Sequence, residues 1–156
     1  MSKTAILILA MAAVAAAQYQ TVSIDDRGKL LIGLDSGKTI EAPKFRGQGA
    51  FAKAAIAGDR TTVGWIAMYP NEAVGEIAGR LVLYRKGRIL HSFATEQVFW
   101  DWQFRDGGKR VAYSTGPTHG GAAECVLRDV DSGRVVARWQ IRNGGEPPDW
   151  AKNLHQ

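Results

Sequence analysis

The sequence predicts an all-β fold of antiparallel four-stranded repeats, arranged as a partial propeller-like stack or as a β-sandwich. Its apolar runs are short, rich in β-branched and aromatic residues, and bounded by Gly and Asp. Beyond the first seventeen residues, no segment of ten or more residues has a strong 3.6-residue apolar period. One turn-plus-strand pattern also recurs along the chain. The 156 residues suffice for one domain.

The N-terminus is typical of a secretory signal peptide. Lys3 is followed by the uncharged run AILILAMAA and then by small residues up to Ala17. A basic start, a short apolar run and an A-x-A site define such segments. The apolar stretch 5–17 is shorter than the about 20 residues that span a bilayer. We therefore expect cleavage before Gln18, no membrane span, and a periplasmic or secreted protein.

Composition excludes several classes of site. The net charge of +5 is dispersed along the chain, and an exported protein seldom meets nucleic acid, so no nucleic-acid partner is predicted. Attraction to an anionic cell-envelope surface stays open. One cysteine excludes an intramolecular disulfide framework and a multi-Cys zinc cluster, and three scattered histidines form no short metal motif. No metal or cofactor is predicted. Cys125 lies in a predicted strand, where burial is favoured over pairing with another chain.

The predicted strands follow one another through short turns. Residues 71–78 are interpreted as a loop. Gly supplies positive φ in turns and Asp bonds its own backbone. The predicted strands are residues 29–34, 61–69, 80–84, 109–114 and 134–141. The predicted turns are residues 35–38, 58–60, 85–88, 106–108 and 131–134.

An internal repeat sets the domain organisation. Residues 56–65 match 104–113 at a constant offset of 48, which aligns Val63 with Val111. The turn-plus-strand unit around Gly37 recurs around Gly87 and Gly133, at separations of 50 and 46 residues. Four strands per repeat of this length are typical of propeller blades. We expect a β-repeat domain over 18–141 and a C-terminal tail over 142–156.

One stretch resembles a known family. It reads Phe104-Arg-Asp-Gly-Gly-Lys-Arg-Val-Ala-Tyr113 and then Leu127-Arg-Asp-Val-Asp-Ser-Gly-Arg-Val135. This resembles the repeat of TolB-type, WD-repeat-like bacterial β-propellers, over residues 50–141 plus a half-repeat at 29–40. The family's usual Ser-Pro before Asp-Gly is absent here. The resemblance implies about two and a half blades and a protein-binding role in the cell envelope.

An open stack of so few blades leaves two apolar sheet faces without a neighbour. Closed propellers have four to eight blades. Three arrangements can cover these faces. A second copy completes a ring, the repeats fold face to face as a sandwich, or the terminal segments cap the stack.

Aromatic residues supply the candidate binding site. Trp100, Trp102 and Phe104 alternate with polar residues, which predicts that they share one strand face. They form either an aromatic platform for sugars or a peptide, or part of the core. The core is favoured because the aligned repeat places Ala52, Ala54 and Ile56 there. Trp150 is either an exposed anchor or docks on the last strand.

His119 lies in the longest glycine-rich loop, residues 116–121. It can titrate or bind a ligand near neutral pH, or belong to a flexible strand connection. No Ser-His-Asp, Cys-His or paired-carboxylate arrangement stands out, so no catalytic residue is predicted. The sequence favours an exported cell-envelope protein-binding or scaffolding module, whose partner is another envelope protein or a second copy. The alternatives are a glycan- or envelope-surface-binding protein and a small secreted hydrolase.

Overall fold

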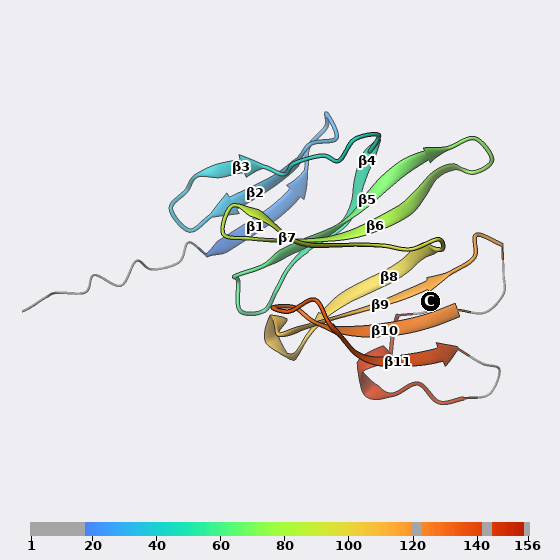
Figure 1. The fold of residues 1–156 in the computed structure, drawn as a ribbon. Helices are drawn as coiled ribbons and strands as arrows, with labels where there is room; N and C mark the ends of the chain where they lie inside the picture. Colours follow the sequence, from blue (N-terminus) through green and yellow to red (C-terminus); the bar gives the residue numbers. More distant parts are fainter. Residues whose placement is uncertain (1–17, 120–122, 142–144, 155–156) are drawn as a thin grey trace, which may run out of the picture.

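The fold is all-β, as predicted, and consists of three antiparallel sheets (Figure 1). The computed structural model describes residues 18–119, 123–141 and 145–154, so the predicted signal segment 1–17 lies outside the described residues. The first sheet contains β1 (Tyr19–Ile24), β2 (Leu30–Leu34) and β3 (Thr39–Glu41). The second contains β4 (Ala50–Ile56), β5 (Val63–Asn71), β6 (Gly75–Arg85) and β7 (Arg88–Ala94). The third contains β8 (Val98–Arg105), β9 (Arg110–Gly116), β10 (Ala123–Asp129) and β11 (Val135–Ile141).

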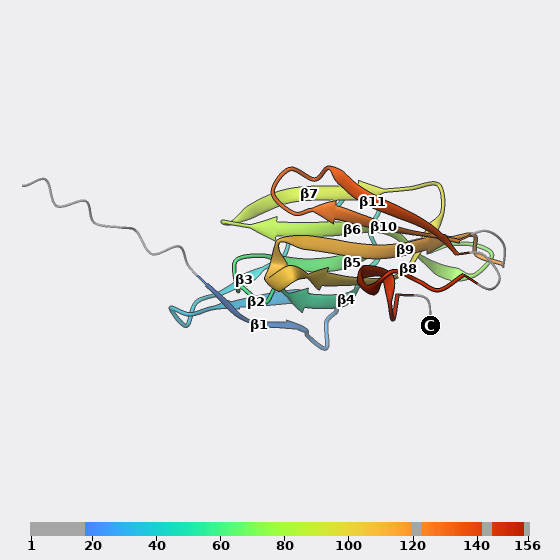
Figure 2. The same cartoon turned by 90° about the horizontal axis from the view of Figure 1, so that it is seen from below.

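Each sheet is an up-and-down meander in which consecutive strands pair. Seen from below, β4 and β8 lie toward one side of the molecule, and β7 and β11 toward the other (Figure 2). The predicted burial of the aligned residues is confirmed, because Val63 of β5 and Val111 of β9 are both 0% exposed. The turn around Gly37 joins β2 to β3, as Gly87 joins β6 to β7. By this alignment β1 corresponds to β5 and β9, so the first sheet has no counterpart of β4 or β8 among the described strands.

Two apolar cores separate the three sheets. The core between the first and second sheets holds Ile32, Trp65 and Val82, and the Phe51 ring meets the Trp65 ring edge-on at 6.1 Å between centroids. The core between the second and third sheets contains Leu83 and Trp102. Burial of this apolar surface is the main force that holds the sheets together.

A close approach at Gly64 fixes how the third sheet packs on the second. A Cβ on Gly64 would lie 2.5 Å from the Trp102 ring, so a larger residue in β5 would push β8 away. Trp102 Nε1 donates to the Lys53 carbonyl at 2.9 Å. That carbonyl lies in a bulge of β4, between Ala52 and Ala55, where Lys53 has a φ of 47°. The bulge provides the acceptor for a buried indole N–H, which would otherwise be costly.

Equivalent residues of the two full repeats contact each other directly. The Asp59 amide donates to the Gly107 carbonyl at 2.8 Å, and the two residues are 48 apart in the sequence. Lys53 and Asp101, also 48 apart, form an ion pair of 3.0 Å. Such contacts are expected when repeats are stacked by one regular displacement.

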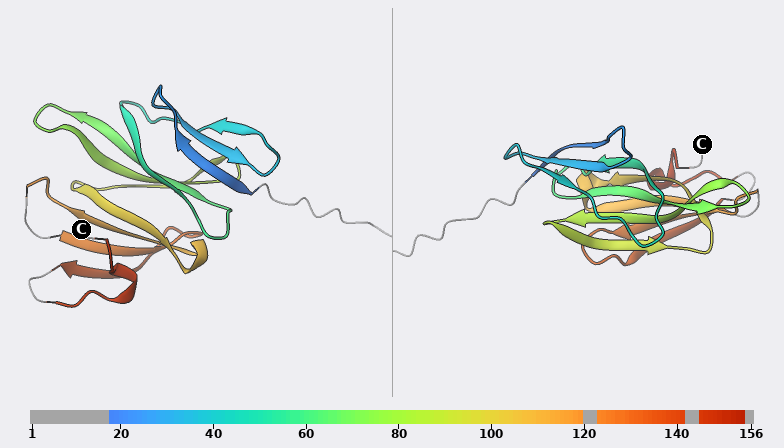
Figure 3. Two further views of the ribbon diagram at one scale, coloured as in Figure 1. Left: turned by 180° about the vertical axis from the view of Figure 1, so that it is seen from behind. Right: turned by 90° about the horizontal axis from the view of Figure 1, so that it is seen from above.

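The sheets pack face to face, as in the sandwich arrangement, and caps cover both ends of the stack, as in the third arrangement. In the first sheet Val22, Ile32 and Ile40 face the core, and the alternate residues Ser23 and Glu41 face outward and are exposed. At the other end, the C-terminal tail packs on the outer face of the third sheet (Figure 3, left). Polar outer faces and terminal caps are what open repeat stacks require.

Side chains of the third sheet bind the tail by its backbone carbonyls. Arg105 donates from Nε to Trp150 O at 3.1 Å and from Nη2 to Lys152 O at 2.7 Å. The Ser114 hydroxyl donates to Leu154 O. Ala151 and Leu154, both 0% exposed, place their side chains on the sheet. The tail is therefore packed on the domain, with the short 3-10 turn Asp149–Ala151 as its centre.

Two expectations about turns need correction. Residues 71–78 are not a loop but the tip of a long β5–β6 hairpin. Asn71 Oδ1 accepts the Ala73 and Val74 amides at 3.0 and 3.2 Å, which closes a tight turn.

Gly87 and Gly133 have the predicted positive φ, 76° and 69°. Their hairpins do not match, however. Gly87 lies in a two-residue turn between the paired Arg85 and Arg88, whereas Gly133 lies in the longer turn between β10 and β11. In the longer turn the Gly133 amide donates to Asp129 O, and the Ser132 hydroxyl donates to Asp129 Oδ1 at 2.7 Å.

Within the described residues, the structure has no helix of the length and apolarity needed to cross a membrane.

Candidate functional site

The predicted aromatic face on β8 does not form as expected. A bulge separates Trp100 from its neighbours, because Phe99 pairs with Thr115 and Asp101 pairs with Ser114. The extra residue shifts the alternation of side chains by one. Phe99 and Trp102 consequently share the inner core. The prediction that Trp100 and Trp102 share one face is wrong.

Trp102 is a core residue, as the aligned repeat favoured. It is 4% exposed, and its ring meets the Phe104 ring edge-on at 5.2 Å between centroids. This contact also satisfies the usual preference of aromatic pairs for edge-to-face geometry. Trp102 therefore has little surface left for a ligand in this structure.

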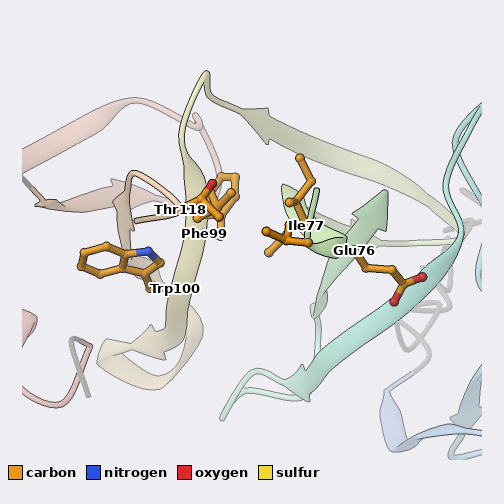
Figure 4. Close-up of a pocket in the computed structure, with 8 residues that line it drawn as sticks. Glu76, Ile77, Phe99, Trp100 and Thr118 are labelled. Carbon is orange, nitrogen blue, oxygen red and sulfur yellow. The ribbon is translucent and has the colours of Figure 1, made fainter. Parts of the chain in front are cut away.

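Trp100 is half-buried and lines a pocket of about 260 Å³ near the tip of the β5–β6 hairpin (Figure 4). Three structural elements form this pocket: the β5–β6 hairpin, strand β8 and the loop after β9. The lining residues are Val74, Glu76, Ile77, Ala78, Val98, Phe99, Trp100 and Thr118. We call this set the hairpin pocket.

The hairpin pocket is mostly apolar. Figure 4 shows Phe99 and Thr118 on one side and Ile77 on the other. Val74, at the hairpin tip, is 41% exposed. The Thr118 hydroxyl is the polar group from the loop after β9. Such a hollow, with few polar groups, suits the burial of an apolar group of a ligand.

The pocket has an acidic surround. The Glu76 carboxylate points away from Trp100 and lies beside Gly49 and the Pro70 ring, so the aliphatic part of Glu76 lines the hollow (Figure 4). Glu72 and Glu96 are exposed on the two nearby connections, the β5–β6 turn and the β7–β8 loop. The exposed carboxylates of Glu72 and Glu96 on these connections favour a ligand that carries positive charge beside an apolar group.

His119 is exposed in the loop after β9, next to Thr118 of the hairpin pocket. The hydrolase alternative requires a cleft that brings His119 to a carboxylate. In the described part of the chain, the structure shows His119 in no hydrogen bond or ion pair with a carboxylate. A ligand-binding role for His119 stays a prediction.

Trp150 docks on the third sheet, which is one of its two predicted fates. It is half-buried against the cluster of Ala151, Leu154 and Cys125. It lies on the tail side of the third sheet and is not among the residues of the hairpin pocket. The structure thus brings Trp100 and the neighbourhood of His119 together and leaves Trp102 and Trp150 elsewhere.

Cys125 is buried in β10, as predicted, and is 0% exposed. Burial, together with the nearby Glu124 carboxylate, raises the pKa of the Cys125 thiol from 9.0 to about 11. The thiolate is the reactive form, so this thiol is inert in the folded state. Nowhere in the described residues do three or more His, Cys, Asp or Glu side chains gather to hold a metal ion.

Sequence reasoning missed Val74 and Ile77. Both fall in the segment interpreted as a loop, where an exposed Val carries no signal. The turn signal of Asn71 followed by Gly75 is present in the sequence and could have identified a hairpin.

Comparison with known proteins adds no identification. No protein-family model matches the chain, and a search of curated proteins found no match. The function is therefore argued from the site.

Proposed function

We propose that this chain is an exported cell-envelope protein that binds another protein through the hairpin pocket. The observation that carries the proposal is an apolar hollow beside an exposed Val74 and a half-buried Trp100. Exposed apolar side chains next to a pocket are typical of protein-binding surfaces. Tryptophan is among the residues that contribute most to such interfaces.

The chemistry of the pocket describes the partner. The hollow accepts an apolar side chain, and Glu72 and Glu96 nearby favour Lys or Arg on either side of it. Opposite charges at the rim guide association and select partners more than they add affinity. The expected ligand is thus an apolar residue within a basic segment of a partner protein.

A scaffolding role also fits the architecture. We infer that the sheets descend from propeller-type repeats, which is supported by the recurring contacts between equivalent residues, such as Asp59 with Gly107. Propellers present loops at the ends of their strands for binding. In this chain the hairpin pocket is formed at such an end.

The test uses site-specific photo-crosslinking in cells. A photoreactive residue at position 74 is expected to give a covalent adduct with one envelope protein, which mass spectrometry identifies. Position 24 provides the matched control, because Ile24 is 43% exposed and lies on the first sheet, outside the pocket. The same adduct at both positions would contradict the proposal.

Substitution provides an independent readout. Val74→Glu places a charge at the pocket and is expected to abolish capture of the partner that crosslinking identifies. Ile24→Glu makes the same kind of change at a similarly exposed site and should leave capture intact. Because both side chains are exposed, both variants should fold. Equal capture by the two variants would exclude the hairpin pocket as the binding site.

Glycan binding is a second candidate, favoured by the Trp100 indole at the pocket, since aromatic faces stack on sugars. Sedimentation with isolated cell-wall polysaccharide tests it. Trp100→Ala should abolish co-sedimentation if the sugar stacks on the indole. Unchanged co-sedimentation of Trp100→Ala, or none with the unmodified protein, would exclude this candidate.

A further inference from the structure

We propose that the end of the stack opposite the hairpin pocket docks on an anionic phospholipid surface. The connections β4–β5, β6–β7, β8–β9 and β10–β11 lie together at one end, whereas β5–β6, β7–β8 and β9–β10 lie at the other (Figure 1). This follows from the meander topology, in which alternate turns share an end. The proposal is independent of the partner pocket, because the two surfaces are on opposite ends of the strands.

Basic side chains gather on these turns. Five of them are exposed, and we call the set the basic turn surface: Lys86, Arg88, Lys109, Arg110 and Arg134. In the sequence these residues fall in three separate turns, and no run of five or six like charges joins them. The sheet topology alone brings them to one end.

Hydrogen bonds join the turns into one surface. The Val130 amide donates to Lys109 O at 2.9 Å, which connects β8–β9 with β10–β11. Arg85 pairs with Asp131, which connects β6–β7 with β10–β11. The backbone positions that carry the cations are therefore fixed relative to one another.

Four acidic residues at this end are engaged within the fold. Asp59 accepts the Thr61 amide at 3.0 Å, Asp129 accepts the Ser132 amide at 2.8 Å, and Asp131 pairs with Arg85. Asp106 lies 3.4 Å from Arg110. Within the described residues, the structure gives no ion pair to Lys86, Arg88, Lys109 or Arg134. These four charges can face a polyanion.

Two exposed valines favour a membrane over a soluble polyanion. Val135 and Val136 follow Arg134 directly and are 38% and 48% exposed. Consecutive strand residues normally face opposite sides, but the register shifts between Leu127 and Arg128 of the partner strand, so both valines stay uncovered. Apolar side chains among basic ones are the pattern of proteins that bind at the bilayer interface.

The chain also enters the fold at this end. The Gln18 carbonyl accepts the Asp35 amide at 2.9 Å, in the turn between β2 and β3. This turn lies at the same end as the β6–β7 turn (Figure 1). Gln18, the expected N-terminus of the mature protein, thus lies at the end that carries the basic turn surface.

The experiment is co-sedimentation with lipid vesicles, using the protein in the form that cells accumulate. Binding is expected to phosphatidylglycerol–phosphatidylcholine vesicles and to weaken strongly on phosphatidylcholine alone or at high salt. Arg88→Gln with Arg134→Gln removes two charges, which should lower the partition coefficient about 30-fold, or about fivefold for each charge. The matched control is Arg27→Gln with Arg46→Gln, two exposed arginines in the β1–β2 turn and the β3–β4 loop, outside the basic turn surface.

A second pair of variants tests the apolar part of the contact. Val136→Ser should weaken vesicle binding several-fold, and Ile24→Ser, at a similarly exposed site on the first sheet, should not. Val74→Glu should bind vesicles normally, which separates this surface from the hairpin pocket.

Three results would overturn the proposal. The first is equal loss of binding in the two arginine pairs, which would reflect net charge alone. The second is equal binding to both lipid compositions. The third is binding to inorganic polyphosphate without binding to vesicles, which would identify a soluble polyanion as the ligand.

Discussion

Replacing Leu154 by Ala should release the C-terminal tail and expose Cys125 to chemical labelling. Leu154 is 0% exposed and packs with Ala151 and Cys125 on the outer face of the third sheet. A buried Leu→Ala change costs about 2.7 kcal/mol at the low end of its usual range. The low end applies because the tail is at the edge of the fold and can relax.

The lost packing energy of Leu154 lowers the free energy needed for the tail to open locally. Since every 1.4 kcal/mol is a factor of ten, a loss of about 2.7 kcal/mol raises the open population about 100-fold. In the closed state Cys125 is covered, and burial raises the pKa of its thiol to about 11. Labelling at pH 8 therefore proceeds through the open state, and its rate reports the opening free energy.

The assay measures the rate of reaction of Cys125 with a disulfide reagent under native conditions. Leu154→Ala should react about 100-fold faster than the unmodified protein. The control, Lys152→Ala, changes an exposed residue of the same tail whose surface ion pair with Asp149 should add little to stability. Equal rates in all three proteins would refute the docking of the tail. A native thiol that reacts as fast as a free one would refute it as well.

Three further predictions concern pH, the repeat and the turns. The pKa of Cys125 in the folded protein lies above the unfolded value of 9.0, so the unfolded chain loses the thiol proton first as pH rises. Between pH 9 and 11 the free energy of unfolding should therefore fall by about 2 to 3 kcal/mol more in the unmodified protein than in Cys125→Ala. Chemical denaturation of the two proteins measures this difference. Val63→Ala and Val111→Ala should each cost about 1 to 3 kcal/mol, and a negligible change in both denaturation midpoints would contradict the repeat alignment. Gly87 and Gly133 both have positive φ, but a Cβ at position 133 would also lie 2.9 Å from the His91 ring. Gly133→Ala should therefore lower the melting temperature more than Gly87→Ala. The opposite order of melting temperatures would count against this packing.

Local sequence patterns predicted much of the fold. Strand-forming runs, Gly-containing turns and the 48-residue offset led to an all-β repeat, to burial of Val63 and Val111, and to positive φ at Gly87 and Gly133. These features depend on neighbouring residues or on a repeat within the chain, so they are visible in the sequence. The long β5–β6 hairpin was missed because polar residues around Asn71 look like a loop until the turn is recognised.

The candidate site was much harder to predict. Trp100 and Trp102 have the same spacing as any pair on a strand, and a bulge at Phe99–Asp101 decides that they separate. The bulge depends on how β8 packs against β4, where Lys53 accepts the Trp102 N–H. No local pattern encodes that contact.

The sequence by itself determined the fold class, the repeat length, the buried position of Cys125 and the positive φ of Gly87 and Gly133. Tertiary structure alone decided the remaining features. It formed the hairpin pocket from Val74, Trp100 and Thr118, docked Leu154 on the third sheet, and gathered the cations of three separate turns at one end. Secondary structure follows from short-range periodicity and turn chemistry, whereas these features arise from the way separate sheets stack and alternate turns share an end. Such relations between distant residues become visible only when the chain is folded.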